Sequence, residues 1–362
     1  MSRTILGSKD LSVGYGQKVV VSGLGFEVCK GEILTIIGSN GAGKSTILKT
    51  IAAQLPFISG SVNLADKDIS EIAAQDIAKT LSVCFTERIA AEKMTCEDIV
   101  ATGRYPYTGR LGILSENDRK IVRDSMELTG TSYLCDTDIR CISDGQRQAV
   151  MLARAISQQT QVLILDEPAS FLDINNKLKL LNILKELVRS RDIAVVQTLH
   201  ELDLAQRFSD KILCIKDNKA DRIGSPEEIF SGSYISELYG IDNGTFLPMF
   251  GTAEAKRITG DPQVFVIGGG GSGIDTYRQL QRLGIPFSAG IIHENDIEYP
   301  VARSLAVELI SEKAYEPISD ESISLALKAI KKCDKVICCL KDFGTMNFGN
   351  KKLLELSGEY LK

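Results

Sequence analysis

Residues 38–46 read GSNGAGKST and contain the full pattern GxxxxGK[ST]. The preceding EILTII is strand-like and the following TILKTIAAQL is helix-like, which is the context in which this pattern binds phosphate groups. Glycine lets the backbone bend so that its N–H groups converge, and the helix N-terminus adds a positive dipole end. We therefore expect the phosphates of a nucleotide to be bound by Gly38, Ser39, Asn40, Gly41, Ala42, Gly43, Lys44, Ser45 and Thr46.

Two of these side chains and two acids downstream carry more specific chemistry. Lys44 would place its charge on the β- and γ-phosphates, and Ser45 would offer a hydroxyl to Mg²⁺. In VLILDEP, residues 162–168, Asp166 ends a hydrophobic strand, where a carboxylate is costly without a partner. A Mg²⁺ ion shared with Ser45 would be that partner. Glu167 is then placed to act as general base or to orient the attacking water.

The order of several motifs resembles that of the ATP-binding subunits of ABC transporters, over residues 3 to about 245. Besides GSNGAGKST and VLILDEP, the motifs are ISDGQRQ at 142–148, ASFLD at 169–173 and TLH at 198–200. The resemblance implies ATP and Mg²⁺ as cofactors. It also implies a homodimer, in which each nucleotide site lies half in each subunit, and a separate transmembrane permease.

The resemblance further assigns roles to single residues. Tyr15, in VGYG, would stack on adenine, an interaction worth about 1–3 kcal/mol per base; a packing residue at a strand edge is the alternative. His200 would be the switch histidine that contacts the γ-phosphate, and Asp173 would couple the two sites of the dimer. Glu87 stands where the family usually carries glutamine. A carboxylate there can still meet Mg²⁺ or its water, and an ordinary solvated acid is the alternative.

The segment ISDGQRQ departs from the family pattern because Asp144 replaces the first of two usual glycines. In the family this segment caps a helix and reaches the γ-phosphate of the opposite subunit. Ser143 would donate its hydroxyl, Gly145 would offer a bare backbone N–H, and a helix would begin near Gln146. An acid facing the phosphate would be repelled, whereas one directed away would favour the helix N-terminus. We expect a working segment in which Asp144 is directed away.

The segment CEDIVATGRYPYTGRLG, residues 96–112, resembles a subfamily that imports iron–siderophores, haem and cobalamin. That subfamily has type II permeases with an external substrate-binding protein. Arg104, Tyr105, Pro106 and Tyr107 would lie near the permease contact. A subdomain loop with aromatic packing is the alternative for each of these residues.

The elements that must position these residues alternate between apolar, strand-like runs and amphipathic, helical ones, which indicates an α/β fold. A chain of 362 residues exceeds what one hydrophobic core usually serves. We expect a P-loop ABC ATPase domain over 1–245, with a helical subdomain at about 87–160. A linker at 246–262 would lead to a smaller Rossmann-like α/β domain over 263–362.

The expected second domain carries its own glycine-rich turn, GGGGSG at 268–273, between the strand-like QVFVI and a helical run. The turn matches GxGxxG, and Glu294 and Asp296 follow at about the distance of an acid that binds a ribose; an ordinary acidic loop is the alternative. His293 is expected to be solvated. The region resembles C-terminal extensions of some cobalamin-type transporter ATPases, in which the segment at 343–350 would close a ligand pocket.

This resemblance leaves two hypotheses for the second domain. The first is a regulatory module that binds a small molecule, either a nucleotide or a corrinoid-related ligand. The second is a domain that stabilises the dimer and has no ligand.

Composition narrows the function classes. A net charge of −5 argues against a nucleic-acid partner held by bulk electrostatics. The nine cysteines are scattered without a CxxC pair, and Cys338 and Cys339 in KVICCL are expected to be buried strand residues. No apolar run approaches the roughly 18 residues that cross a bilayer, and the N-terminus has no signal-peptide core.

We therefore expect a cytoplasmic protein that sits on the inner face of the membrane through its permease. Its expected function is that of the ATP-hydrolysing, energy-coupling subunit of an importer. The alternative is a non-transport ABC ATPase of a soluble machine. The sequence carries no second ATPase copy, long coiled coil or basic bias, which disfavours that alternative.

Overall fold

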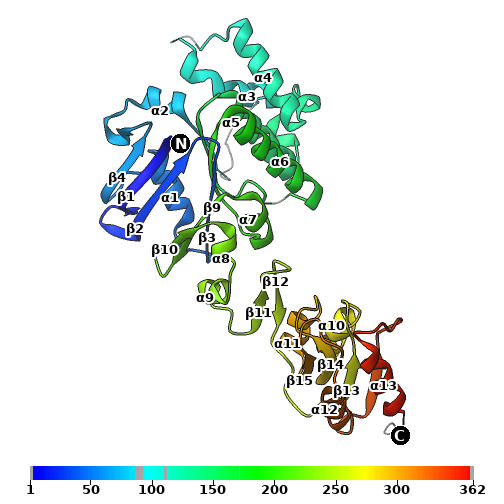
Figure 1. Ribbon diagram of the computed structural model, residues 1–362. Helices are drawn as coiled ribbons and strands as arrows, with labels where there is room; N and C mark the ends of the chain where they lie inside the picture. Colours follow the sequence, from blue (N-terminus) through cyan, green and yellow to red (C-terminus); the bar gives the residue numbers. More distant parts are fainter. Residues whose placement is uncertain (1–2, 86–92, 110–111, 171, 359–362) are drawn as a thin grey trace. The chain divides into compact units, whose positions relative to one another are not determined.

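The chain folds into two compact units that divide between Tyr239 and Gly240, each with its own sheet (Figure 1). The sequence also predicts two α/β units. The structure is a computed structural model, and it describes residues 3–85, 93–109, 112–170 and 172–358.

Unit 1 is built on a ten-stranded sheet in the order β5-β4-β1-β2-β10-β9-β3-β8-β7-β6. From β9 to β6 neighbouring strands are parallel, and the β1–β2, β1–β4, β4–β5 and β9–β10 pairs are antiparallel. The strands are β1 (Thr4–Tyr15), β2 (Lys18–Cys29), β3 (Ile33–Gly38), β4 (Ser59–Leu64), β5 (Lys67–Asp68), β6 (Leu81–Cys84), β7 (Val162–Leu165), β8 (Ala194–Thr198), β9 (Lys211–Lys216) and β10 (Lys219–Gly224).

Strands β3, β7 and β8 are apolar along nearly their whole length because every one of their residues is buried, as is usual when both faces of a parallel sheet are covered. Between β6 and β7 the chain forms α3, α4 and α5, which pack on one another as a helical subdomain. The helices of unit 1 are α1 (Lys44–Ile51), α2 (Ala74–Thr80), α3 (Cys96–Ala101), α4 (Glu116–Thr129), α5 (Asp144–Ser157), α6 (Ile174–Arg191), α7 (Leu202–Phe208), α8 (Pro226–Ile229) and α9 (Tyr234–Tyr239).

The sheet order places the chemically interesting loops together. Strands β3, β8 and β7 are consecutive and parallel, so their carboxyl ends lie at one edge of the sheet. The glycine-rich turn follows β3, the Asp166–Glu167 pair follows β7, and His200 follows β8. Loops at the carboxyl ends of parallel strands are where ligands bind in open α/β sheets.

Unit 2 has a four-stranded parallel sheet in the order β15-β14-β13-β16. Alternate residues of β13 face two separate cores: Val264 and Val266 pack in one, Phe265 and Ile267 in the other. The sheet is thus covered on both faces. The elements are β13 (Val264–Ile267), α10 (Ile274–Leu283), β14 (Phe287–His293), α11 (Tyr299–Leu305), β15 (Glu308–Glu312), α12 (Asp320–Ile330), β16 (Lys335–Cys338) and α13 (Phe348–Ser357).

The segment expected as a linker, 246–262, contains most of a β-hairpin instead of featureless chain. Strand β11 (Gly244–Leu247) pairs antiparallel with β12 (Thr252–Ala255), and both pack against α11. Glu254 of this hairpin is buried and forms an ion pair with Arg278 of α10. The hairpin therefore belongs to unit 2, and its short strands are too brief to produce a clear sequence period.

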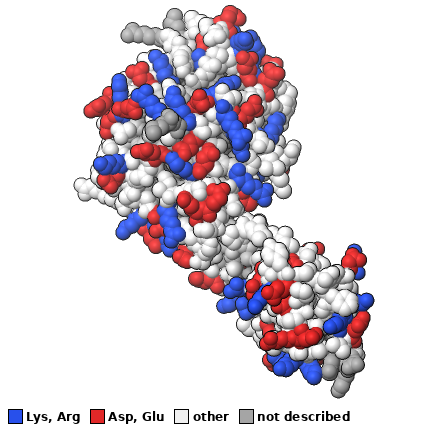
Figure 2. Space-filling view, in the orientation of Figure 1, with Lys and Arg blue, Asp and Glu red and all other residues white. Residues whose placement is uncertain are grey.

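Basic and acidic side chains are interspersed over the face of the molecule that Figure 2 presents. The described residues on this face therefore show no continuous basic area of the kind that binds nucleic acid (Figure 2). Among the described residues, no helix combines the length and the apolar character needed to span a membrane.

Candidate functional site

The turn after β3 has the geometry that its glycines predict. Gly43, at the N-terminus of α1, has φ 93°, a left-handed conformation that favours glycine. A Cβ added at Gly43 would lie 2.5 Å from Val21 and 2.7 Å from Val20. Only a residue without a side chain fits here. The other residues of the turn separate by exposure: Ser39, Asn40, Gly41 and Ser45 are exposed, whereas Ala42 and Thr46 are buried.

Lys44 folds back over this turn and is only 6% exposed. Its Nζ donates hydrogen bonds to the carbonyl oxygens of Gly38, at 2.8 Å, and Ser39, at 3.0 Å. Burial lowers the pKa of Lys44, while the nearby carboxylates of Glu167 and Asp166 act in the opposite direction. The ammonium group of Lys44 therefore lies over the turn and interacts electrostatically with Glu167 and Asp166 at the same edge of the sheet.

The two acids are tied to β8 through one hydroxyl. Asp166 is 6% exposed, and its Oδ1 accepts a hydrogen bond from Thr198 Oγ1 at 2.8 Å. The backbone N–H of Glu167 donates to the same Thr198 oxygen, also at 2.8 Å. Sequence reasoning missed Thr198, although a hydroxyl residue that ends a buried strand two positions before His200 was a signal for it.

The Glu167 carboxylate is held at both oxygens. His200 Nε2 lies 2.5 Å from Oε1, and Ser170 Oγ donates to Oε2 at 3.1 Å. Both side chains come from loops at the same sheet edge. The structure therefore brings together Lys44, the acid pair and His200, which the sequence predicted as one site, and adds Thr198 and Ser170 to it.

The ISDGQRQ segment forms the start of α5, two residues earlier than expected. Ser143 is the N-cap: its Oγ accepts the N–H of Gln146 at 3.2 Å, and Gln146 Oε1 accepts the N–H of Ser143 at 2.9 Å. Asp144 forms an ion pair with Arg147 of its own helix. Its charge is thus balanced locally, in the first turn of the helix where an acid is favourable.

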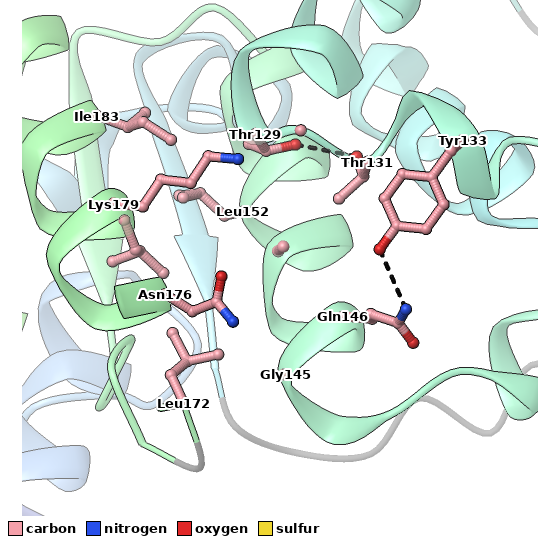
Figure 3. A pocket seen from close by; sticks show the side chains of 13 residues that line it. Thr129, Thr131, Tyr133, Gly145, Gln146, Leu152, Leu172, Asn176, Lys179 and Ile183 are labelled. Carbon is pink, nitrogen blue, oxygen red and sulfur yellow. Dashed lines mark hydrogen bonds between the residues drawn. The ribbon is translucent and has the colours of Figure 1, made fainter. Parts of the chain in front are cut away.

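A cavity of about 250 Å³ separates this helix start from α6 (Figure 3). On the α5 side lie Gly145 and Gln146, whose Nε2 donates to Tyr133 Oη at 3.1 Å. On the α6 side lie Leu172 and Asn176. The ISDGQRQ segment and the residues at the start of α6 therefore face a common space within one subunit.

Asp173 stands beside this cavity as the N-cap of α6. It accepts hydrogen bonds from the backbone N–H of Asn176 at 2.8 Å and from Asn176 Nδ2 at 2.9 Å. Tyr15 ends β1 with 54% of its surface exposed, so its ring is free on the surface of the subunit. Glu87, expected to contact Mg²⁺, lies outside the described residues.

The loop expected at the permease is anchored by Arg104. This side chain is only 4% exposed and donates to Asp118 Oδ1 and to the carbonyl of Ser157, each at 2.8 Å. Its guanidinium also stacks 4.1 Å from the centre of the Tyr107 ring. Arg104 is therefore engaged inside the subdomain, as in the alternative of a subdomain loop with aromatic packing, and its place near a permease stays a prediction. Tyr105, next to it, is 60% exposed.

The glycine-rich turn of unit 2 contains a carboxylate of the chain itself. Glu298 is fully buried, and its Oε2 accepts the N–H groups of Gly269 and Gly273, each at 3.0 Å. Tyr277 donates its hydroxyl to Oε1 of the same group. A Cβ added at Gly268 or Gly273 would overlap Oε1 of Glu298. The close approach of this side chain explains why these two positions are glycine.

A second acid accepts another N–H group of the turn. Asp296 Oδ2 accepts a hydrogen bond from Gly270 N at 2.6 Å, so this acid contacts the turn itself, and the ribose contact considered from the sequence stays a hypothesis. Glu294 is exposed. His293 is not simply solvated, because its Nε2 lies 2.8 Å from the carbonyl oxygen of Glu316.

A cavity of about 550 Å³ lies beside this turn, at the carboxyl ends of β13, β14 and β16. Asn347 and Asn350, from the segment expected to close a pocket, line it together with Cys339. Cys338 and Cys339 were expected to be buried strand residues, but both are half-buried. Cys338 ends β16, an edge strand whose residues are partly exposed, and Cys339 lies just beyond the strand.

Two family models match the chain: the ABC transporter model over residues 21–170 and the MJ0874 family model over 287–361. An uncharacterized ABC transporter ATP-binding protein of Methanocaldococcus jannaschii, MJ0873, is 43% identical over 76% of this chain and 96% of its own length. The iron(3+)-hydroxamate import ATP-binding protein FhuC of Bacillus subtilis is 34% identical, over 66% of this chain and 88% of the relative.

The cobalamin import ATP-binding protein BtuD of Halobacterium salinarum is 29% identical, over 83% of this chain and 76% of the relative. Among solved structures, a metal-chelate type ABC transporter in an inward-facing conformation aligns with TM-score 0.58 and 24% identity, over 65% of this chain and 89% of that one. Fold and site together define a P-loop ATPase domain. The chain belongs to the ABC transporter ATP-binding family, and it is an ATP-hydrolysing member.

Proposed function

We propose that this chain is the energy-coupling subunit of an ABC importer and works as a homodimer on a separate transmembrane permease. The observation that carries the proposal is the assembly of Lys44, Asp166, Glu167 and His200 at one edge of the unit 1 sheet. Relatives named for import of hydroxamates and cobalamin support the transport role. The protein would lie on the cytoplasmic face of the membrane, held there by the permease, which an external substrate-binding protein supplies with cargo.

The phosphates of ATP would bind at the turn before α1. Its glycines leave no side chain between the backbone and a ligand, and α1 presents its positive end there. Lys44 already lies over the turn and can exchange its two carbonyl partners for phosphate oxygens. The exposed ring of Tyr15 would stack on adenine.

Ser45 and Asp166 would hold Mg²⁺, and the donor set fits, because a hydroxyl and a carboxylate are oxygen ligands of the kind Mg²⁺ prefers. Asp166 is nearly buried with one oxygen bonded to Thr198, which fixes the orientation of the group. When bound, Mg²⁺ supplies neutralisation of phosphate charge. An equivalent role for Glu87 follows from its place in the sequence.

Glu167 would accept the proton of the attacking water or orient it. The carboxylate is directed by Ser170 and His200, so the general base is fixed before substrate arrives. His200 contacts this base and is itself partly exposed, so it could also donate to the γ-phosphate. Proton acceptance and phosphate contact are thus assigned to two side chains that touch each other.

The second half of each site would come from the partner subunit. Ser143 and Gly145 stand at the exposed N-terminus of α5, where a hydroxyl and a backbone N–H can meet a γ-phosphate across the dimer. Gln146 holds the cap in place, and Asp173 would carry the state of one site to the other. Asp144 is paired with Arg147, which removes the main electrostatic objection to this role.

The proposed cargo class is that of iron–siderophores, haem and cobalamin. Its test is uptake of labelled cobalamin by cells that carry the native permease with this protein or its Glu167→Gln form. Loss of uptake in Glu167→Gln, with normal uptake in the exposed control Glu186→Gln, is expected for a cobalamin importer. Equal uptake in all strains would exclude cobalamin and direct the search to haem and ferric siderophores.

For unit 2 we propose a regulatory role in which a small molecule binds the cavity beside the glycine-rich turn. A corrinoid-related ligand remains compatible with this role, since the match to the cobalamin import relative covers 83% of the chain and therefore extends past the end of unit 1. A nucleotide bound through the turn is a weaker candidate, because Glu298 and Asp296 accept the N–H groups of Gly269, Gly270 and Gly273. A thermal shift of the full chain with cobinamide is expected; no shift would favour a purely structural unit.

A further inference from the structure

The hydroxyl of Thr198 connects the two acids of the ATP site. Thr198 ends β8, is fully buried, and has hydrogen bonds on both sides of its oxygen. It donates its single hydrogen to Asp166 Oδ1 and accepts the backbone N–H of Glu167, each at 2.8 Å. A methyl group in place of the hydroxyl would leave both partners without this contact.

The backbone at Glu167 needs such a contact. Its φ is +50°, a left-handed conformation that is unfavourable for a non-glycine residue and persists only where the surroundings hold it. The N–H to Thr198 fixes the peptide on one side of this residue. The direction of the Glu167 side chain depends on that backbone conformation, and so does its contact with His200.

We propose that Thr198 is a positioning residue for ATP hydrolysis. Its hydroxyl orients two groups relative to each other. These are the carboxylate of Asp166, assigned to Mg²⁺, and the backbone of Glu167, assigned as general base. The proposal rests on the roles proposed above for Asp166 and Glu167. Thr198 itself touches neither substrate nor water in this account, and it acts through the two acids.

The test compares three variants of the full-length chain. Thr198→Val removes the hydroxyl and keeps the branched shape, and Thr198→Ser keeps the hydroxyl. The matched control is Thr35→Val: Thr35 is equally buried, on the neighbouring strand β3, and its hydroxyl accepts hydrogen bonds from Gln197 and Ser209. This control removes a buried hydroxyl that has no contact with the acids.

We expect Thr198→Val to lower kcat about 100-fold, the loss typical of a catalytic group misplaced by about 1 Å, with KM for ATP changed less than about threefold. Thr198→Ser should recover most of kcat, and Thr35→Val should retain it. Thermal unfolding measured in parallel reports whether each variant is folded. In the Glu167→Gln background, Thr198→Val should cause little further loss, because both changes affect the same step.

Three results would overturn the proposal: kcat within threefold of wild type in Thr198→Val, no recovery in Thr198→Ser, or an equal loss in Thr35→Val. The last two would reduce Thr198 to a packing residue. Absence of ATP hydrolysis in the wild-type chain with its permease is a different outcome, and it would refute the proposed function itself.

Discussion

The two glycine-rich turns of this chain, 38–43 and 268–273, begin from the same local plan. Each follows a buried parallel strand and leads into a helix, and in each a glycine is required where another group approaches the backbone. In unit 1 the group lying over the turn is the cation of Lys44. In unit 2 it is the carboxylate of Glu298. One turn is therefore suited to an anion from outside, and the other already contains one.

The comparison separates what a glycine pattern predicts from what it does not. Glycine spacing sets where the backbone can be approached closely. The identity of the approaching group depends on residues elsewhere in the fold, here a side chain at the N-terminus of α11. A phosphate added to the turn of unit 2 would have to displace a buried carboxylate that has three hydrogen-bond donors.

The largest expected effect comes from removing the charged side chain that contacts each turn, Lys44 in unit 1 or Glu298 in unit 2. Lys44→Ala should lower ATP turnover by about 10³-fold, because the charge on the β- and γ-phosphates is lost from a largely buried position. Glu298→Ala should leave turnover within about twofold, since its contacts are confined to unit 2. Steady-state phosphate release by the full chain measures both. Similar losses in the two variants would remove the distinction between the turns.

A second test concerns Asp144, an acid in the first turn of α5 that is not expected to contact the phosphate. Asp144 pairs with Arg147, so Asp144→Gly should retain ATP hydrolysis within about threefold. Gly145→Asp should lower it by about 100-fold or more, since an unpaired carboxylate would stand where a bare N–H is needed. ATPase assays of the two variants check this order. Comparable losses in both would mean that Asp144 itself contacts the nucleotide region.

A third test measures what the internal carboxylate contributes to unit 2. Glu298→Ala leaves the N–H groups of Gly269 and Gly273 and the hydroxyl of Tyr277 without their partner, which should lower the free energy of unfolding of unit 2 by about 3 kcal/mol. Burial, together with the nearby Glu298 charge, raises the pKa of Tyr277, so this hydroxyl stays a donor at neutral pH. Denaturant unfolding of the full chain provides the measurement, with Glu294→Ala, at an exposed acid, as control. Equal stability of the two variants would contradict the account.

Much of the ATP site was predictable because its residues are carried by local patterns. The strand–turn–helix context of 38–46 and the apolar run before Asp166 each indicate an element and the group at its end. The contact of Thr198 with both acids was not predictable, because it depends on β8 lying beside β7 in the sheet. Burial of Arg104 likewise depends on Asp118 of α4 and Ser157 of α5.

In unit 2, contacts between residues far apart in the sequence were even harder to predict. GGGGSG predicted the turn after β13 correctly, but the residue that fills it lies beyond α10 and β14. The acids near position 296 were visible in the sequence, and their spacing alone did not distinguish a ribose contact from a contact with the turn. The contact with the turn becomes visible only in the fold, which returns this loop to the carboxyl end of β13.

The central claim is that one of the two turns binds phosphate and the other does not. Equilibrium binding of labelled ATP with Mg²⁺ to the full-length Glu167→Gln chain, which should bind without turnover, counts the sites directly. The account predicts one ATP per chain, and none once Lys44→Ala is added. A second ATP per chain that survives Lys44→Ala and disappears with a substitution in 268–273 would contradict it.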